Sequence, residues 1–369
     1  MASERQVIAR MPAWTWIAPL GAVVLLGLKF AGVLAPDGRI VLVLAAAFLA
    51  GSVFAAVHHA EVVALRVGEP LGSILLALAV TIIEVALIVS LMLSGQPGSE
   101  AFARDTIYAA VMIVLNGVVG LCLVFGGARH HEQTFKAEGA AAALGVLGTL
   151  AMIALILPNY TRTTPGPLYA PSQLILVGTV SLCLYAIFVF IQTIRHRDYF
   201  LSDDAASGDA EHDHSTPTLN AARQSALLLL IALVAVVLLA KVLSLPLEQT
   251  IAAAGLPPSF VGVVIAALVL LPEGVAALHA ARANRLQTSL NLALGSALAS
   301  IGLTIPAVAA VSIVFRQRLV LGLQPAEMAL LVLTLFISTL TLATGRTTVL
   351  QGAVHLVIFS VFLFLSAVP

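Results

Sequence analysis

Two carboxylates, Glu84 and Glu273, lie deep inside long apolar stretches of the sequence. The other acidic residues of this 369-residue chain fall near the ends of such stretches or between them. On membrane-insertion scales a charged side chain at the centre of a spanning helix costs about 2.5 to 3.5 kcal/mol, so an acid there generally has a function. A neutral acid hydrogen-bonded between helices is the structural alternative. We therefore treat the two glutamates as a candidate ion and proton site.

Polar or helix-disturbing residues accompany each glutamate. Thr81 precedes Glu84 by three residues and shares its helical face, which offers a hydroxyl oxygen beside the carboxylate. Pro272, directly before Glu273, has no N–H, and its ring crowds the carbonyl one turn earlier. Together with Gly274, this proline predicts a helix break near the site that exposes backbone oxygens. An ordinary kink of a membrane helix is the alternative interpretation.

Hydroxyl and amide side chains follow in the next apolar stretch of each half. Ser296, Ser300 and Thr304 are spaced four residues apart and form one polar stripe, while the first half offers Asn116. Close helix packing through small residues is the alternative reading of the stripe. Oxygen ligands suit hard cations such as calcium and sodium better than zinc or copper. We therefore predict cation and proton binding by Glu84, Glu273, Thr81, Ser296, Ser300 and Asn116, with the two glutamates as the metal ligands.

Such a site would bind a cation and a proton in competition. A carboxyl group buried in apolar surroundings favours its protonated form, whereas a bound cation favours the carboxylate. If only the cation-loaded and protonated forms switch the site between membrane faces, exchange follows without ATP. A passive cation channel is the alternative, and an intramembrane metal-dependent hydrolase is a weaker one because no nucleophile or metal-ligand constellation is evident. We therefore expect a secondary transporter and not an enzyme, with no cofactor beyond the transported cation.

The histidines carry less information. His58, His59 and Glu61 lie at one end of an apolar stretch but do not match the HExxH arrangement of zinc hydrolases. We interpret them as gating residues at the membrane surface, with plain solvation as the alternative, and His279 as a gating residue near a pathway mouth. His355, inside the last stretch, is predicted to be a helix-contact histidine with satisfied hydrogen bonds.

The elements that must position these residues are membrane-spanning helices. Sixty per cent of the residues are apolar and 10% are charged, which excludes an ordinary soluble domain. The chain repeatedly produces apolar stretches of the length a spanning helix needs. We predict an all-α integral membrane protein with eleven spans: 14 to 34, 40 to 57, 71 to 93, 107 to 127, 140 to 158, 172 to 194, 224 to 243, 259 to 279, 289 to 314, 326 to 343 and 348 to 367.

The connections between spans suggest a duplicated design. An acidic hydrophilic linker over 196–223 leaves five spans on each side once the first helix is set aside. We therefore predict an N-terminal segment with an extra first helix (1–38), a first five-helix repeat (39–195) and a second one (224–369). Five spans per repeat would make the repeats inverted relative to one another. Most Lys and Arg residues fall on the same side of the membrane as the N-terminus, which predicts a cytoplasmic N-terminus.

Several strings resemble a known family, the bacterial calcium/proton (also sodium/proton) antiporters of the cation/calcium exchanger superfamily. The resemblance covers nearly the whole chain and includes HHAEVVALRVGEPLGS, IIEVALI around Glu84, RDTIYAAVMIV, LLPEGVAAL around Glu273, NLALGSALASIGLTIP and ATGRTTVLQGAVHLVIF. It implies inverted five-helix repeats, an essential glutamate in each, and multi-pass placement in the bacterial inner membrane. The wider superfamily usually has an asparagine three residues before each glutamate, where this chain has Thr81 and Leu270.

The resemblance also sets the expected partners. It implies calcium as the leading substrate and protons as the exchanged ion. Two amide oxygens expected near calcium are missing at Thr81 and Leu270, so the choice of cation among calcium, sodium and potassium is less settled than the antiport mechanism. The lipid bilayer is the expected surroundings, nucleic acid is not expected, and a homo-oligomer is compatible with the sequence.

Overall fold

The computed structural model describes residues 12–33, 38–68, 71–93, 95, 98–201 and 217–369. In these parts of the chain, ten helices are long and apolar enough to cross a membrane, and the shorter apolar helix α1 (Trp14–Phe30) precedes them. The eleven predicted spans therefore correspond to these helices, and the prediction of an all-α membrane protein is confirmed.

Five helices make up the first half of the chain after α1. They are α2 (Arg39–Val67), α3 (Leu71–Met92), α4 (Phe102–Met112), α6 (Ala137–Ala151) and α7 (Pro171–Phe190). Three of them continue through a π-helical segment: α4 through Ile113–Val118 into α5 (Val119–His130), α6 through Met152–Ile156, and α7 through Ile191–Arg195. Short 3-10 turns lie at Ser99–Ala101, Leu157–Tyr160 and Arg197–Tyr199.

The second half is built from five long helices and no π-helical segment is found in its described residues. The helices are α9 (Leu219–Ala253), α10 (Phe260–Arg282), α11 (Leu286–Phe315), α12 (Pro325–Leu342) and α13 (Val349–Ala367). Helix α9 is longer than the predicted span of 224 to 243 at both ends. At its C-terminal end it continues because Pro246 does not stop it. The predicted linker therefore ends earlier than residue 223, and its residues 202–216 lie outside the described part of the chain.

The chain divides into two compact units. Unit 1 consists of Met1–Ile83 with Gly208–Leu243, and unit 2 consists of Glu84–Ser207 with Ser244–Pro369. In unit 1, α1 packs closely on α2, since a Cβ added at Gly51 would lie 2.9 Å from the Cβ of Ala18. These units are not the two predicted repeats, whose boundaries remain a prediction.

Helices α4 and α10 run parallel and in close contact within unit 2. A Cβ added at Gly262, near the start of α10, would lie 2.7 Å from the backbone carbon of Asp105, near the start of α4. One added at Gly274 would lie 3.2 Å from the side chain of Val118, further along both helices. The two glycines therefore let α10 lie against α4 over about three turns. An inverted second repeat would run these two helices in the same direction.

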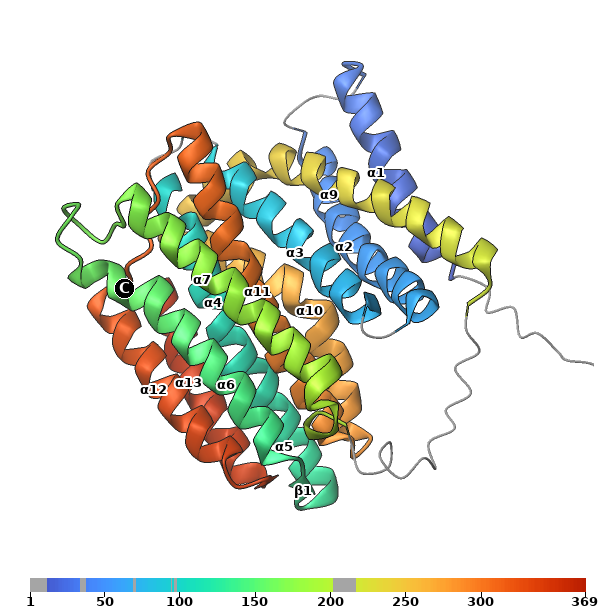
Figure 1. Ribbon diagram of the computed structural model, residues 1–369. Coiled ribbons are helices and arrows are strands. Elements are labelled where there is room, and N and C mark those ends of the chain that lie inside the picture. Colours follow the sequence, from blue (N-terminus) through green and yellow to red (C-terminus); the bar gives the residue numbers. More distant parts are fainter. Residues whose placement is uncertain (1–11, 34–37, 69–70, 94, 96–97, 202–216) are drawn as a thin grey trace, which may run out of the picture. The chain divides into compact units, whose positions relative to one another are not determined.

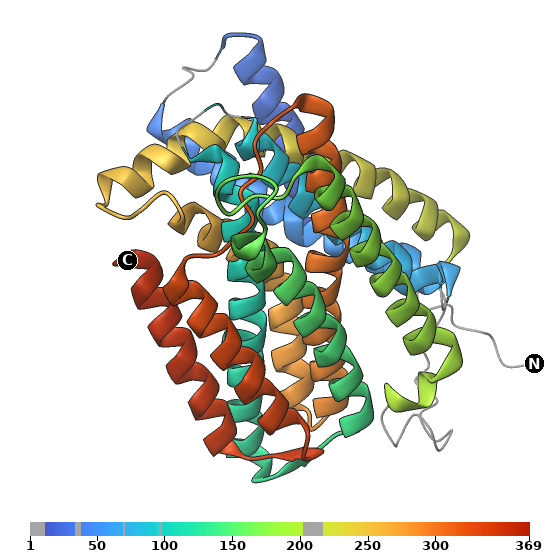
Figure 2. The same cartoon turned by 60° about the vertical axis from the view of Figure 1, so that its left-hand side comes forward.

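Two loops close one end of unit 2. Strand β1 (Gln133–Thr134) pairs antiparallel with β2 (Arg346–Thr347), which joins the α5–α6 connection to the α12–α13 connection. Helices α5, α6, α12 and α13 lie side by side above this small sheet (Figure 1), and Figure 2 shows α12 and α13 meeting there. The side-chain amide of Gln133 also donates to the carbonyl of Ala281 at 2.9 Å, so the α10–α11 turn lies at the same end.

Candidate cation and proton site

Glu84 is held against the middle of helix α11. The residue is 4% exposed, and the hydroxyl of Ser300 donates to its Oε1 at 2.5 Å. Thr304, one turn further along α11, also lies near this carboxyl group. The predicted polar stripe of α11 thus meets the first of the two predicted glutamates, and Ser300 is the residue that joins them.

Ser300 and Thr304 point to Glu84 because the helix repeat places residues four apart on one face. Both are almost fully buried, at 4% and 0% exposure. An acid in such surroundings needs partners that offer oxygen or donate a hydrogen bond. The Glu84–Ser300 pair therefore marks a polar position inside an otherwise apolar helix bundle.

Glu273 lies near the middle of α10 and is partly buried. Helix α10 is continuous from Phe260 to Arg282, with Pro272 inside it, so the predicted helix break at Pro272 and Gly274 is wrong. Proline lacks the N–H but keeps helical φ, and the neighbouring hydrogen bonds carry the helix past it. Gly274 instead serves close packing, since it faces Val118 of the segment that follows α4.

The helix irregularity lies in the first half of the chain instead. Residues Ile113–Val118 form a π-helical segment between α4 and α5, opposite Gly274 of α10. A π-helical turn inserts one extra residue into an α-helix and shifts its hydrogen bonds, and such turns are frequent at functional sites. The sequence carries no proline in this segment, so nothing in it signalled the irregularity.

Asn116 lies within this π-helical segment but faces other helices. Its amide N–H₂ donates to Thr334 of α12 at 2.9 Å, and its oxygen lies 3.1 Å from Nδ1 of His355 in α13. An amide oxygen can only accept, so Nδ1 of His355 carries the proton. Nε2 of His355 lies 3.2 Å from the hydroxyl of Thr341, which can donate to it. The amide of Asn116 is thus committed to α12 and α13, which disfavours its predicted role as a direct cation ligand.

This four-residue group, Asn116, Thr334, Thr341 and His355, is a buried polar network. All four side chains are at most 4% exposed. The prediction that His355 is a helix-contact histidine is therefore confirmed. The two threonines were not singled out from the sequence, because no local pattern shows which helices the histidine will meet.

The remaining predicted ligands are placed as follows. Thr81 is buried within α3, and its hydroxyl donates to the carbonyl of Ala77 at 2.8 Å, a bond within its own helix. Ser296 is half-buried on α11, one turn before Ser300. Binding of a cation by Thr81 and Ser296 therefore stays a prediction.

The histidine pair at residues 58 and 59 packs inside unit 1. His59 is fully buried, with Nε2 3.1 Å from the carbonyl oxygen of Thr15 and Nδ1 3.3 Å from the hydroxyl of Ser225. The ring of His58 lies 5.9 Å from that of Trp14. These contacts join α2 to α1 and α9. The gating role predicted for His58, His59, Glu61 and His279 stays a prediction, and His59 has a clear packing role besides.

The chemistry available at Glu84 is that of oxygen ligands. Among the described residues, no group of three or more His, Cys, Asp or Glu side chains could hold a metal ion. A cation at Glu84 would therefore take its other ligands from hydroxyls, backbone carbonyls or water. Such a shell suits hard, exchangeable ions better than tightly held transition metals.

The chain matches a known protein family over both halves. The family described as "Sodium/calcium exchanger protein" matches residues 38–194 and 224–368. The chain is 56% identical over 371 residues to the "Putative ionic transporter y4hA" of Sinorhizobium fredii, with all of both chains covered. It is 34% identical to the "Sodium-potassium/proton antiporter ChaA" of Escherichia coli over 98% of each chain. It is also 25% identical to a "Ca(2+)/H(+) antiporter" of Aphanothece halophytica, over 84% of this chain and 86% of that one.

Solved structures show the same fold. The structure titled "Structure of native YfkE" superposes with a TM-score of 0.73 at 17% identity, covering 96% of this chain and 100% of that one. The "Crystal Structure of H+/Ca2+ Exchanger CAX" gives a TM-score of 0.72 at 16% identity, covering 95% and 86%. The family match over both halves, the ten apolar helices and the buried glutamate all fit a membrane transporter. The chain belongs to the sodium/calcium exchanger family, whose members are transporters and not enzymes.

Proposed function

We propose that the protein exchanges a metal cation for protons across a bacterial inner membrane. The observation that carries this proposal is the buried Glu84 carboxyl group bonded to Ser300 in the middle of a membrane helix. Glu273 is its proposed counterpart in the second half. Two relatives described as cation/proton antiporters support the same reaction class.

The proposed cycle uses the two states of a buried carboxyl group. When no cation is bound, apolar surroundings favour the protonated acid. A cation that arrives with its positive charge displaces the proton and is held by the carboxylate, with the Ser300 oxygen and water as further ligands. In both states the negative charge of the carboxylate is compensated, by a proton or by the cation, so the site can switch between the membrane faces. An empty carboxylate keeps its charge, which is costly inside the membrane. Alternating access of the protonated and cation-loaded states then yields exchange, coupled to the proton gradient.

We propose broad selectivity, with calcium, sodium and potassium competing for the same carboxylates. Calcium fits the all-oxygen surroundings, and a relative is a calcium/proton antiporter. We include sodium and potassium among the substrates for two reasons. Thr81 and Leu270 stand where the superfamily usually has asparagines, and the 34%-identical relative is described as a sodium-potassium/proton antiporter.

The distribution of charge within unit 2 supports a cytoplasmic location for the end that carries β1 and β2. Basic residues gather in the connections at this end: Arg129, Lys136, Arg282, Arg285 and Arg346. Lys and Arg are enriched in cytoplasmic loops. We therefore propose that α4, α10 and α12 begin on the periplasmic side, which corresponds to a cytoplasmic N-terminus.

The test is proton movement in proteoliposomes that hold the full chain and a preset pH gradient. Addition of calcium, sodium or potassium should collapse the gradient, and a mixture of two should show competition. Glu84→Gln and Glu273→Gln should each abolish the response, because the amide cannot exchange a proton for a cation. Glu138→Gln is the matched control, since Glu138 is an exposed acid at the start of α6. It should transport normally.

Two results would contradict the proposal. The first is cation flux without any proton movement, which is the behaviour of a passive channel. The second is normal exchange by both Glu84→Gln and Glu273→Gln. In either case the glutamates would not be the groups that couple the two ions.

A further inference from the structure

A pocket of about 570 Å³ lies at the end of unit 2 opposite the β1–β2 pair. Its walls come from the first turns of α4, α10 and α12 and from the last turn of α13. Polar side chains on these walls include Asp105, Tyr108, Ser259 and Glu327. All lie within the first two turns of their helices or just before them, so the pocket is separate from the mid-helix site around Glu84.

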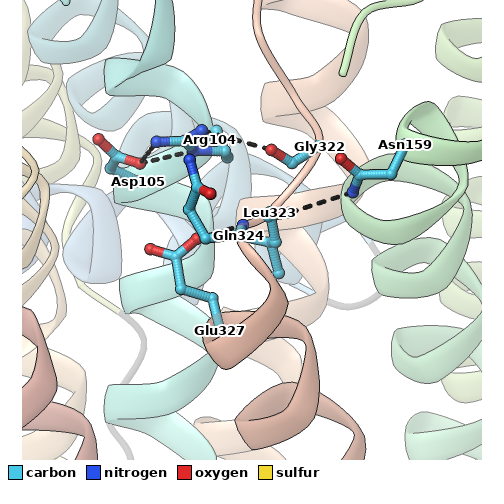
Figure 3. A network of polar contacts seen from close by, with 7 residues as sticks. All are labelled: Arg104, Asp105, Asn159, Gly322, Leu323, Gln324 and Glu327. Carbon is cyan, nitrogen blue, oxygen red and sulfur yellow. Dashed lines mark hydrogen bonds and ion pairs between the residues drawn. The ribbon is translucent and has the colours of Figure 1, made fainter. Parts of the chain in front are cut away.

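The pocket is acidic although an arginine lies nearby. Arg104 donates to Asp105 through Nε and Nη2, both at 2.7 Å and both to the same oxygen, Oδ1 (Figure 3). Asp105 Oδ2 therefore takes no part in the contact with Arg104. Arg104 neutralises one carboxylate, and Glu327 brings a second negative charge. Neither lysine nor arginine lines the pocket, so its net charge favours a cation.

Glu327 is fixed in place by the start of α12. Its Oε2 accepts from the backbone N–H of Gln324 at 2.8 Å, which caps the helix. The preceding loop is itself anchored, because Arg104 donates to the carbonyl of Gly322 and Asn159 donates to that of Leu323 (Figure 3). The carboxylate is therefore held in a preformed position, which reduces the entropy lost on binding.

Tyr108 gives a second, independent indication that the pocket binds a ligand. It is only 4% exposed, it lines the pocket, and its hydroxyl has no hydrogen-bond partner among the described residues. A buried hydroxyl normally finds a partner, because leaving it unpaired costs about 1 to 3 kcal/mol. Its ring lies edge to face with that of Phe362, with centroids 5.5 Å apart. Aromatic rings also attract cations through their faces.

The size and lining of the pocket suit an occupant larger than a bare metal ion. A volume of about 570 Å³ lies in the range of small-molecule sites. Much of the wall is apolar, with Val263, Leu330, Phe362 and Leu365 among its residues. A fitting ligand has a positive group with N–H donors for the carboxylates and the tyrosine hydroxyl, and an apolar portion for the apolar wall.

We propose that this pocket binds an organic ammonium ion, with the ammonium group between Glu327, Asp105 and the Tyr108 hydroxyl and the apolar portion against α13. The ammonium donates to the two carboxylates and to the tyrosine oxygen. Such a group is carried both by soluble amines and by the headgroup of phosphatidylethanolamine. The proposal does not depend on the transport reaction, because the pocket shares no side chain with the Glu84 site.

The test is isothermal titration calorimetry on the purified full chain with ethylammonium, butylammonium and hexylammonium chloride. Affinity should rise about fourfold for each methylene that the apolar wall covers. Glu327→Gln should weaken binding of butylammonium at least fivefold, and its amide oxygen still caps α12. Tyr108→Phe should weaken it about threefold, since it removes a neutral acceptor. Glu100→Gln is the matched control, because Glu100 is an exposed acid next to α4 and does not line the pocket.

A second experiment, in lipid nanodiscs, decides whether the ammonium group comes from a lipid headgroup or from a soluble amine. If the lipid is the source, phosphatidylethanolamine nanodiscs should weaken butylammonium binding relative to phosphatidylglycerol nanodiscs. Equal affinity in both would assign the pocket to soluble amines. The proposal is overturned if no alkylammonium binds to folded protein, if affinity does not depend on chain length, or if Glu327→Gln and Glu100→Gln bind equally well.

Discussion

At the scale of residues, the central feature is one hydrogen bond between a hydroxyl and a buried carboxyl group. Ser300 donates to Glu84 when the site is without a cation, and the same oxygen has lone pairs for a metal. The serine thus serves both states of the proposed cycle. Alanine in its place would leave the carboxyl group in apolar surroundings with one partner fewer.

Ser300→Ala should therefore weaken cation binding without unfolding the protein. A hydrogen bond to a charged group contributes about 1.5 to 3 kcal/mol, which predicts an apparent KM for the cation at least tenfold higher. The measurement is the cation dependence of proton movement in proteoliposomes. Ser360→Ala is the control, because that exposed hydroxyl donates to the carbonyl of Leu356 within its own helix, away from Glu84. An unchanged KM in Ser300→Ala would remove the serine from the site.

The sequence predicted this part of the site because membrane burial makes a carboxylate conspicuous. Glu84 and the stripe through Ser300 were both identified from residue type and spacing. The direction in which Asn116 points was not predictable. Nothing in a single sequence shows that its partners are Thr334 and His355, which lie more than 200 residues away.

At the scale of elements, two helix features shape the surroundings of the site. The π-helical segment Ile113–Val118 turns Asn116 toward α12 and α13, while Gly274 lets α10 approach the same segment. The predicted break at Pro272 was wrong because proline alone does not decide whether a membrane helix ends. Neighbouring helices can support the helix through it. The buried network around Asn116 holds three helices together.

Removing the centre of this network should lower the stability of the protein. Asn116→Ala leaves His355 Nδ1–H without its partner and removes one of the two hydrogen bonds of the Thr334 hydroxyl, which still donates to the sulfur of Met112. A buried unpaired group costs about 1 to 3 kcal/mol. We expect a lower midpoint of thermal unfolding in detergent. His355→Ala should cost less in the Asn116→Ala background than in the wild type, because the two residues share one interaction. Independent, additive effects would show that the network does not act as a unit.

At the scale of the whole molecule, composition and span order predicted the fold class, and the resemblance of several sequence strings to a known family predicted the family. The apolar stretches had to be helices because every backbone polar group inside a bilayer needs an internal partner. The helix ends were less predictable. Helix α9 runs through Pro246 to Ala253, ten residues past the predicted end at residue 243. The boundaries of the compact units also depend on which helices pack together, which local sequence patterns do not encode.

The claim that cation and proton compete for the same carboxylates is tested most directly by proton release. Calcium, and separately sodium, is added to purified protein in weakly buffered detergent solution near neutral pH, and the released protons are counted. The wild type should release protons as the cation binds. Each single variant, Glu84→Gln or Glu273→Gln, should release fewer protons than the wild type, and the double variant should release none. Equal release by the wild type and the double variant would contradict the account, because the protons would then come from other groups.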